Sequence, residues 1–165
     1  MTLPLTIDLE IDNLRKAYLA GDLSPETVFK QIANTAAQYE KHNIWIYKLS
    51  EEQLQSYFLR LADLDPADTP LWGIPFAIKD NIDLAGVPTT AGCKEFAYTP
   101  TQSATIVQNL IDAGAVPVGK TNLDQFATGL NGTRSPWGAC LNSHDDKYIS
   151  GGSSSGSAVA VALGM

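Results

Sequence analysis

A run of eight glycines and serines, residues 150–157, constrains this chain more than any other stretch. Glycine reaches backbone conformations that other residues avoid, and serine adds hydroxyl groups of little bulk. A flexible linker would lead into polar sequence or a new domain, but this run leads into the small apolar residues of segment 158–163. We therefore predict a loop that turns directly into a helix. Such a junction can bind an anion at the helix N-terminus, or hold a nucleophile or a proton relay.

Lys79 ends a second informative stretch, an apolar, strand-like run over residues 71–78. A lysine that is forced toward the interior loses solvation, and this loss favours its neutral form. A neutral lysine can accept a proton from a serine. The other interpretation is a strand-end lysine that pairs with Asp80 or Asp83, and the residues alone leave both interpretations open.

Four motifs, taken in order, resemble those of the amidase signature family, serine hydrolases that use a Ser-cisSer-Lys triad. The matching segments are 73–81, 89–92, 114–122 and 151–157. The resemblance extends from about residue 11 to residue 165. It implies an α/β fold, the N-terminal portion of the amidase-signature fold, in which a mixed β-sheet core is flanked by helices.

The resemblance also implies roles for individual residues. Lys79 matches the catalytic base, and Ser153 matches the bridging serine, whose preceding peptide bond is cis in the family. The nucleophilic serine of the family follows the bridging serine at a distance that places it beyond residue 165. We therefore expect a chain that is truncated before the nucleophile segment and is inactive on its own. The resemblance implies no cofactor and no metal.

The irregular stretch 129–150 lies next to the Gly-Ser run in the sequence, and binding residues concentrate in loops of this kind. We expect part of its backbone to line the substrate pocket, and the resemblance supports the same residues: Gly129, Leu130, Asn131 and Gly132. A plain surface loop is the alternative. Arg134 could hold a substrate carboxylate through a bidentate fork, or it could brace the loop through Asp124 or a carbonyl group.

Within the family, segments 122–129, 132–138 and 148–150 most resemble the allophanate hydrolases. This resemblance implies hydrolysis of a non-peptide C–N bond, with allophanate converted to ammonia and carbon dioxide in urea degradation. Two alternatives stay open. The chain could belong to another amidase-signature enzyme, such as a glutamyl-tRNA amidotransferase A-type subunit. It could also be a non-catalytic fragment or an interaction module.

Length and composition limit the domain organisation and the partners. A chain of 165 residues with 44% hydrophobic residues can bury one core, so we expect one domain over residues 1–165 and no separate second domain. Its helical start covers about residues 8–65 and its α/β part about residues 71–165. A net charge of −7 argues against nucleic-acid and anionic-membrane partners. The expected partner is a small-molecule amide substrate, and the full-length protein could be a homodimer.

Targeting signals and cysteines indicate the compartment. No apolar run reaches the length of about 18 residues that a membrane-spanning helix requires. Residues 1–5 lack the basic start and apolar core of an export signal. Cys93 and Cys140 match no metal or disulfide framework. We therefore expect free thiols and a cytoplasmic protein.

Apolar spacing and capping residues predict helices over residues 8–20, 25–39, 50–64 and 104–113, with Ser24, Ser50 and Ser103 as N-caps of the last three. Strands are expected over residues 44–47, 71–79 and 115–118, and a short helix over residues 122–127. This alternation of helices and strands favours an α/β sheet.

Residues 114–121 fit the phosphate-binding pattern G-x-x-x-x-G-K-T. A true phosphate-binding loop follows a strand and surrounds the phosphate with successive backbone amides. Here a predicted helix precedes the segment, its middle has the pattern of a strand, and Pro117 lacks an amide hydrogen. We therefore reject nucleotide binding at this segment.

Overall fold

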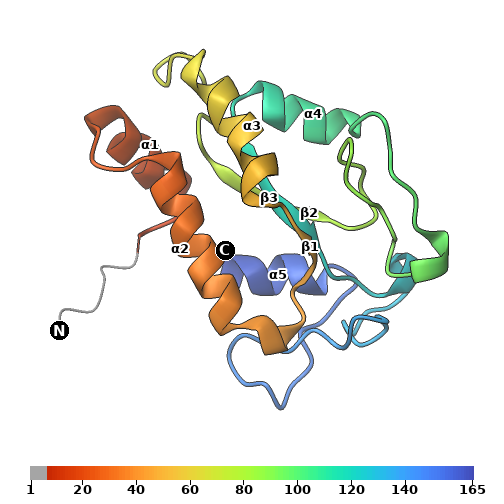
Figure 1. Cartoon of the computed structure of the whole chain (residues 1–165). Coiled ribbons are helices and arrows are strands. Elements are labelled where there is room, and N and C mark those ends of the chain that lie inside the picture. The colour runs from red at the N-terminus through yellow and green to blue at the C-terminus, as the bar shows by residue number, and fades with distance from the viewer. Residues whose placement is uncertain (1–6) are drawn as a thin grey trace.

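The computed structural model describes residues 7–165, so the expectation about residues 1–5 lies outside it. Within residues 7–165 the chain forms five α-helices and three strands (Figure 1). The helices are α1 Ile11–Ala20, α2 Pro25–Gln38, α3 Glu51–Ala62, α4 Thr105–Asp112 and α5 Ser155–Ala162. The strands are β1 Trp45–Lys48, β2 Pro75–Lys79 and β3 Val116–Thr121. Three 3₁₀ turns cover Glu40–His42, Lys94–Phe96 and Gln125–Ala127.

The N-termini of α2 and α3 confirm the capping predictions. The Ser24 hydroxyl accepts a hydrogen bond from the N–H of Thr27 at 3.3 Å, and Pro25 occupies the first turn, where its missing N–H costs nothing. At α3, Ser50 and Gln53 form a capping box in which each side chain accepts from the other's backbone N–H, at 3.2 and 2.9 Å. Local sequence therefore determines where both helices begin.

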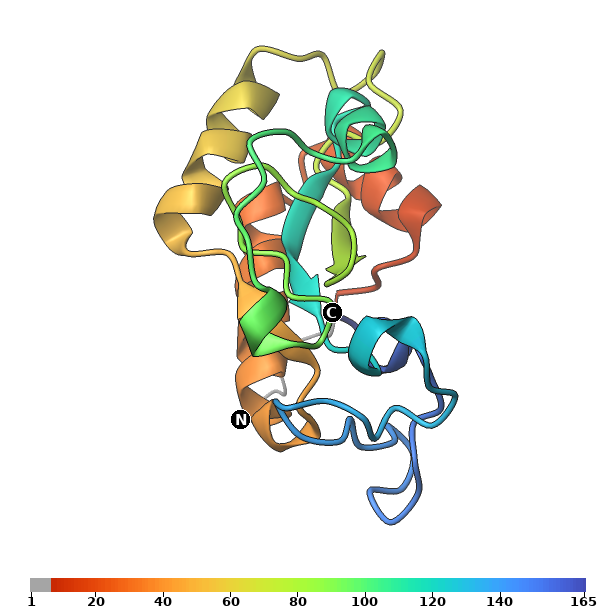
Figure 2. The same ribbon diagram turned by 90° about the vertical axis from the view of Figure 1, so that its right-hand side faces the viewer.

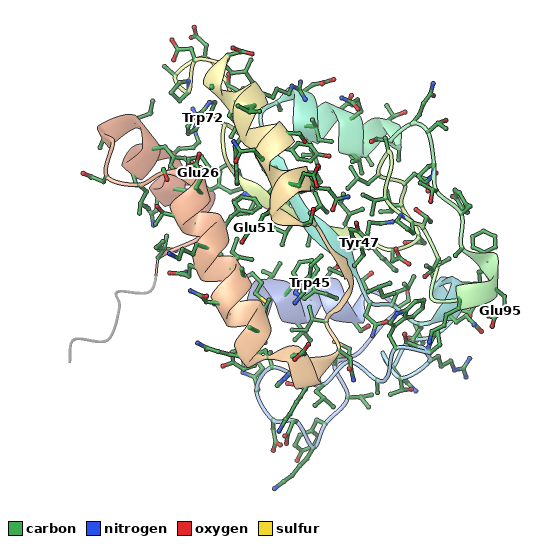
Figure 3. All side chains as sticks on the ribbon, in the orientation of Figure 1. Glu26, Trp45, Tyr47, Glu51, Trp72 and Glu95 are labelled. Atoms are coloured by element: carbon green, nitrogen blue, oxygen red, sulfur yellow. The ribbon has the colours of Figure 1, made fainter. Side chains whose placement is uncertain are left out.

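The three strands form a mixed sheet in the order β1-β3-β2, and this arrangement confirms the predicted sheet type. β3 runs antiparallel to β1 and parallel to β2. The register with β1 shifts between Trp45 and Tyr47. A shift of this kind changes which face a side chain occupies, so Trp45 packs against the cluster that includes α5, whereas Tyr47 packs against the cluster that includes α4 (Figure 3).

Two hydrophobic clusters hold the helices on the sheet. One joins α1, α2 and α5 to Val116 and Val118 of β3. The other joins α4 to Ile78 of β2 and to Leu84 and Val87 in the segment that follows. In Figure 1, α4 and α5 lie on opposite sides of the strands. In Figure 2, the arrowheads of β2 and β3 end beside the cyan and blue segments that contain the irregular stretch and the Gly-Ser run.

The N-terminus of α4 corrects one prediction. Ser103 is not the N-cap, because the helix begins after Ala104, which makes no side-chain capping bond. The Ser103 hydroxyl instead accepts a hydrogen bond from the N–H of Ala85 at 3.0 Å. This serine therefore fixes the segment that follows β2.

The helix predicted over residues 122–127 is reduced to the 3₁₀ turn Gln125–Ala127. Phe126 and Ala127 have positive φ angles of 52° and 56°. The N–H of Phe126 donates to the carbonyl of Ala91 at 2.7 Å, and that of Gln125 donates to the carbonyl of Arg134 at 2.7 Å. Tertiary partners therefore replace the helical hydrogen bonds that the local pattern predicted.

The segment with the phosphate-loop pattern is a strand. β3 covers its last six residues, Val116–Thr121, and is buried along its whole length, so its amides cannot surround a phosphate. Cys93 and Cys140 are free, as expected. Within residues 7–165, no helix combines the length and the apolarity that are needed to cross a membrane.

Candidate active site

Lys79 and Ser153 meet at the carboxyl end of β2. The Lys79 Nζ lies 2.8 Å from the Ser153 Oγ and 2.9 Å from the Ser154 Oγ. The peptide bond between Gly152 and Ser153 is cis, as the family resemblance implied. Lys79 and Ser153 are half-buried and Ser154 is exposed, so the pair is open to solvent on one side.

The environment of Lys79 makes its amine less basic than that of an exposed lysine. Burial lowers the pKa of Lys79, and the negative charge of Asp124 partly opposes this change. A neutral Nζ within hydrogen-bond distance of a hydroxyl can accept its proton. The arrangement can therefore draw a proton from Ser153, provided that another group replaces it.

Asp80, one of the two alternative partners of Lys79, pairs with another lysine, and no ion pair joins Lys79 to Asp83 in residues 7–165. The Asp80 carboxylate lies 3.0 Å from the Lys120 Nζ, and both side chains are fully buried. Lys120 also donates to the Thr89 hydroxyl at 2.9 Å, and the Asp80 carboxylate accepts from the N–H of Thr90 at 3.0 Å and from the Thr90 hydroxyl. This buried network fixes the end of β2. Because Asp80 is paired with Lys120, the Lys79 amine bonds to Ser153 and Ser154 instead.

Thr121 connects β2 to the start of α5. It is the register partner of Lys79 in the parallel pair. Its hydroxyl lies 2.7 Å from the Ser157 hydroxyl in the first turn of α5. Gly156 lies so close to β1 and the end of β3 that a Cβ would overlap the backbone of Ile44 and Asn122. Strand register and a glycine contact therefore place the Gly-Ser run beside Lys79.

The four residues expected to bind substrate form a loop around Asp124. Gly129 and Gly132 are buried, whereas Leu130 and Asn131 are exposed. The N–H groups of Asn131 and Gly132 donate to the Asp124 carboxylate at 3.2 and 3.0 Å. These two N–H groups are therefore already bonded within the protein, so a substrate would have to use the remaining backbone groups of the loop.

Arg134 braces this loop through its backbone. Its N–H donates to the Asp124 carboxylate at 2.9 Å, and its carbonyl accepts from Gln125. The Arg134 side chain is exposed. Of the two interpretations of Arg134, the structure contains the bracing contact with Asp124, made by the main chain.

A model of the family described as Amidase matches residues 26–165 of this chain. The chain belongs to the amidase family. Urea amidolyase of Saccharomyces cerevisiae is 52% identical over 124 residues, which cover 74% of this chain and 7% of that protein. The A-type subunit of the Lactobacillus acidophilus glutamyl-tRNA(Gln) amidotransferase is 41% identical over 157 residues, which cover 94% of this chain and 32% of that protein.

A solved structure of an allophanate hydrolase from Kluyveromyces lactis is also similar to this amidase. The TM-score is 0.82 at 40% sequence identity, over 99% of this chain and 27% of that chain. The match extends over the mixed sheet, its helices and the Gly-Ser run. This amidase chain spans a third or less of the length of the relatives named here.

The sequence analysis did not identify three buried polar residues that position the groups of the candidate site. They are Lys120, Thr121 and Asn122, which are fully buried at the end of β3. The Asn122 amide donates to the carbonyls of Asn43 and Gly138 at 2.8 and 3.1 Å. The missed signal was the change from an apolar strand to consecutive polar residues, because the carboxyl ends of parallel strands are where α/β proteins form their sites.

Proposed function

We propose that the complete protein hydrolyses a non-peptide amide bond, with Lys79 as the general base and Ser153 as the relay. The observation that carries this proposal is the 2.8 Å contact between the Lys79 Nζ and the Ser153 Oγ. Membership in the amidase family supports it. We further propose that the attacking serine comes from sequence that these 165 residues do not include.

The proposed chemistry moves one proton along the relay. Neutral Lys79 takes the proton of the Ser153 hydroxyl while Ser153 takes the proton of the attacking serine, whose oxygen then bonds to the amide carbon. When the C–N bond breaks, the relay returns the proton to the leaving nitrogen, and ammonia departs. Water then attacks the acyl-enzyme, and the relay again accepts and returns a proton. The hydrogen bond from Lys79 to Ser154 holds the amine in place during these steps.

We propose allophanate as the substrate, converted to ammonia and carbon dioxide in urea degradation. The allophanate hydrolase structure supports the substrate, and the urea amidolyase relative supports the link to urea. We also propose a cytoplasmic location, in keeping with the two free cysteines. The proposed partner is the small amide itself, without nucleic acid or membrane, and the complete protein could act as a homodimer.

A second candidate is an amidotransferase component that releases ammonia from glutamine. The favouring observation is the amidotransferase relative, which matches more of this chain than urea amidolyase does, 94% against 74%, although at lower identity. The two candidates share the relay and differ in the amide that is hydrolysed. Ammonia release from allophanate and from glutamine separates them.

The test is ammonia release by the complete protein, with allophanate and glutamine as alternative substrates, beside the 165-residue chain alone. We expect the complete protein to hydrolyse allophanate and the 165-residue chain to be inactive. Ammonia from glutamine alone would favour the amidotransferase. Activity of the 165-residue chain would contradict our assignment of the nucleophile, and would make Ser154, Ser155 or Ser157 the attacking serine. Release from neither amide would refute both substrates.

A further inference from the structure

Asp124 lies where three parts of the site meet. It follows β3 by three residues and is fully buried. Its carboxylate accepts hydrogen bonds from the N–H groups of Asn131, Gly132 and Arg134 at 3.2, 3.0 and 2.9 Å. Successive backbone N–H groups that converge on one anion form a nest, and such nests stabilise negative charge. Segment 131–134 is therefore folded around this carboxylate.

The same residue contacts the relay serine. The N–H of Asp124 donates to the carbonyl of Ser153 at 3.1 Å. A Cβ on Gly152 or on Gly129 would overlap the Asp124 carboxylate, so both chain segments approach it at positions without side chains. The predicted substrate loop and the cis peptide segment are thus shaped around one side chain.

The Asp124 carboxylate is ionised and acts on Lys79. Burial raises the pKa of this carboxyl, but the backbone donors of Arg134, Gly132 and Asn131 outweigh burial and leave the pKa below its usual range. Within residues 7–165 the ion pairs join Arg60 to Asp112 and Lys120 to Asp80, so no lysine or arginine pairs with Asp124. Its negative charge therefore acts on the Lys79 amine and raises the pKa of that group.

We propose that Asp124 is a positioning residue, whose carboxylate holds segment 129–134 and the Gly152–Ser153 peptide in one arrangement beside Lys79. It touches none of the proposed reacting atoms, so it acts through the loop and the relay. Its importance for turnover rests on the proposed amide hydrolysis, whereas its effect on the loop does not. The effect of Asp124 on the loop can be measured without substrate.

The test compares Asp124→Asn with wild type in the complete protein, by hydrogen exchange of peptides read by mass spectrometry. Asparagine keeps the shape of the side chain, but its NH₂ group takes the place of one carboxylate oxygen and cannot accept a hydrogen bond from the N–H groups of the nest. We expect exchange in peptides over residues 129–134 to rise at least about tenfold, because the lost bonds protect those amides. Peptides over α2 should not change. Asp145→Asn is the matched control, since Asp145 is exposed and its carboxylate accepts one backbone hydrogen bond, from Lys147 at 3.0 Å.

Two exchange results would overturn the proposal. Unchanged exchange over residues 129–134 would mean that the carboxylate does not hold the loop. An equal rise in that loop and in α2 would mean a general role in folding rather than local positioning. Because neither result depends on turnover, a failure of the proposed amide hydrolysis would leave this test intact.

Kinetics of the same variant give the second readout. We expect Asp124→Asn to lower kcat/KM by at least about 10²-fold, the range seen when a catalytic group is displaced. We also expect activity to appear at a lower pH, because the charge that raises the pKa of Lys79 is gone. Asp124→Glu keeps the charge and should restore the wild-type pH dependence of activity. The loop should stay perturbed, because the longer side chain would contact Gly129 and Gly152. A kcat/KM within about threefold of wild type in Asp124→Asn would contradict the positioning role.

Discussion

The Lys79 amine contacts the Ser153 hydroxyl although the two residues are 74 positions apart in the sequence. The contact depends on the sheet, because Thr121 is the register partner of Lys79 and also bonds to Ser157 in α5. A one-residue change of register would turn Lys79 to the other face of the sheet. The proposed base and relay are therefore brought together by strand pairing and by the junction between the Gly-Ser run and α5.

The pH dependence of activity should report the neutral form of Lys79. Burial lowers the pKa of Lys79 from its ordinary value of 10.5, so activity should rise with pH along a one-proton limb centred below 10.5. The unfolded chain binds this proton more tightly than the folded one, so the same group makes stability increase with pH between the lowered pKa and 10.5. The measurement is kcat/KM from neutral to alkaline pH. A limb centred at or above 10.5 would argue against this account.

The buried pair of Asp80 and Lys120 should be costly to break. Lys120→Met leaves the buried Asp80 carboxylate without a counter-charge, although Thr90 still donates to it, and loss of one partner of a buried ion pair typically costs about 3–5 kcal/mol. The matched control is Arg60→Met, which breaks the ion pair between Arg60 and Asp112. These two side chains are 41% and 56% exposed. That variant should lose much less stability than Lys120→Met, because water screens an exposed pair. Urea unfolding compares both variants with wild type, and equal losses would show that burial does not set the difference.

Gly156→Ala should loosen the junction between the Gly-Ser run and α5. The new Cβ would overlap the backbone of Ile44 and Asn122, and neither can move as a flexible side chain could. We expect a loss of about 1–3 kcal/mol, as for other overpacked sites, together with reduced ammonia release. Ala158→Ser in the same turn is exposed and should cost less than about 0.5 kcal/mol. Equal thermal stability of the two variants would refute the close contact.

Much of the fold could be predicted because its signals are local. Ser24 and Ser50 begin their helices with caps that the sequence displays, and β3 has an apolar run that is typical of a strand. Lys79 and Ser153 were predicted as candidate site residues because their motifs resemble a known family, and the fold brings their side chains together. The chemistry of lysine and serine alone left a structural ion pair open as an alternative.

The failures of prediction came from tertiary contacts. Ser103 has the chemistry of a cap, but Ala85 supplies the N–H that its hydroxyl accepts from. The segment before Ala127 has helical spacing, but the carbonyls of Arg134 and Ala91 accept hydrogen bonds from its N–H groups. The role of Asp124 depends on a nest closed by residues 131–134. Hydrophobic periodicity and capping patterns in the sequence do not predict tertiary hydrogen bonds of this kind.

The central claim is that Lys79 and Ser153 act as one unit in amide hydrolysis. The most direct measurement is ammonia release from allophanate by the complete protein carrying Lys79→Ala, Ser153→Ala or both, with Lys41→Ala at an exposed position as the control. Each single variant should lose about 10²–10⁴-fold in kcat, as for loss of general acid–base catalysis. The double variant should fall no more than about threefold further, because members of a unit are not additive. Losses that multiply in the double variant, or a Lys79→Ala protein within about tenfold of wild type, would contradict the account.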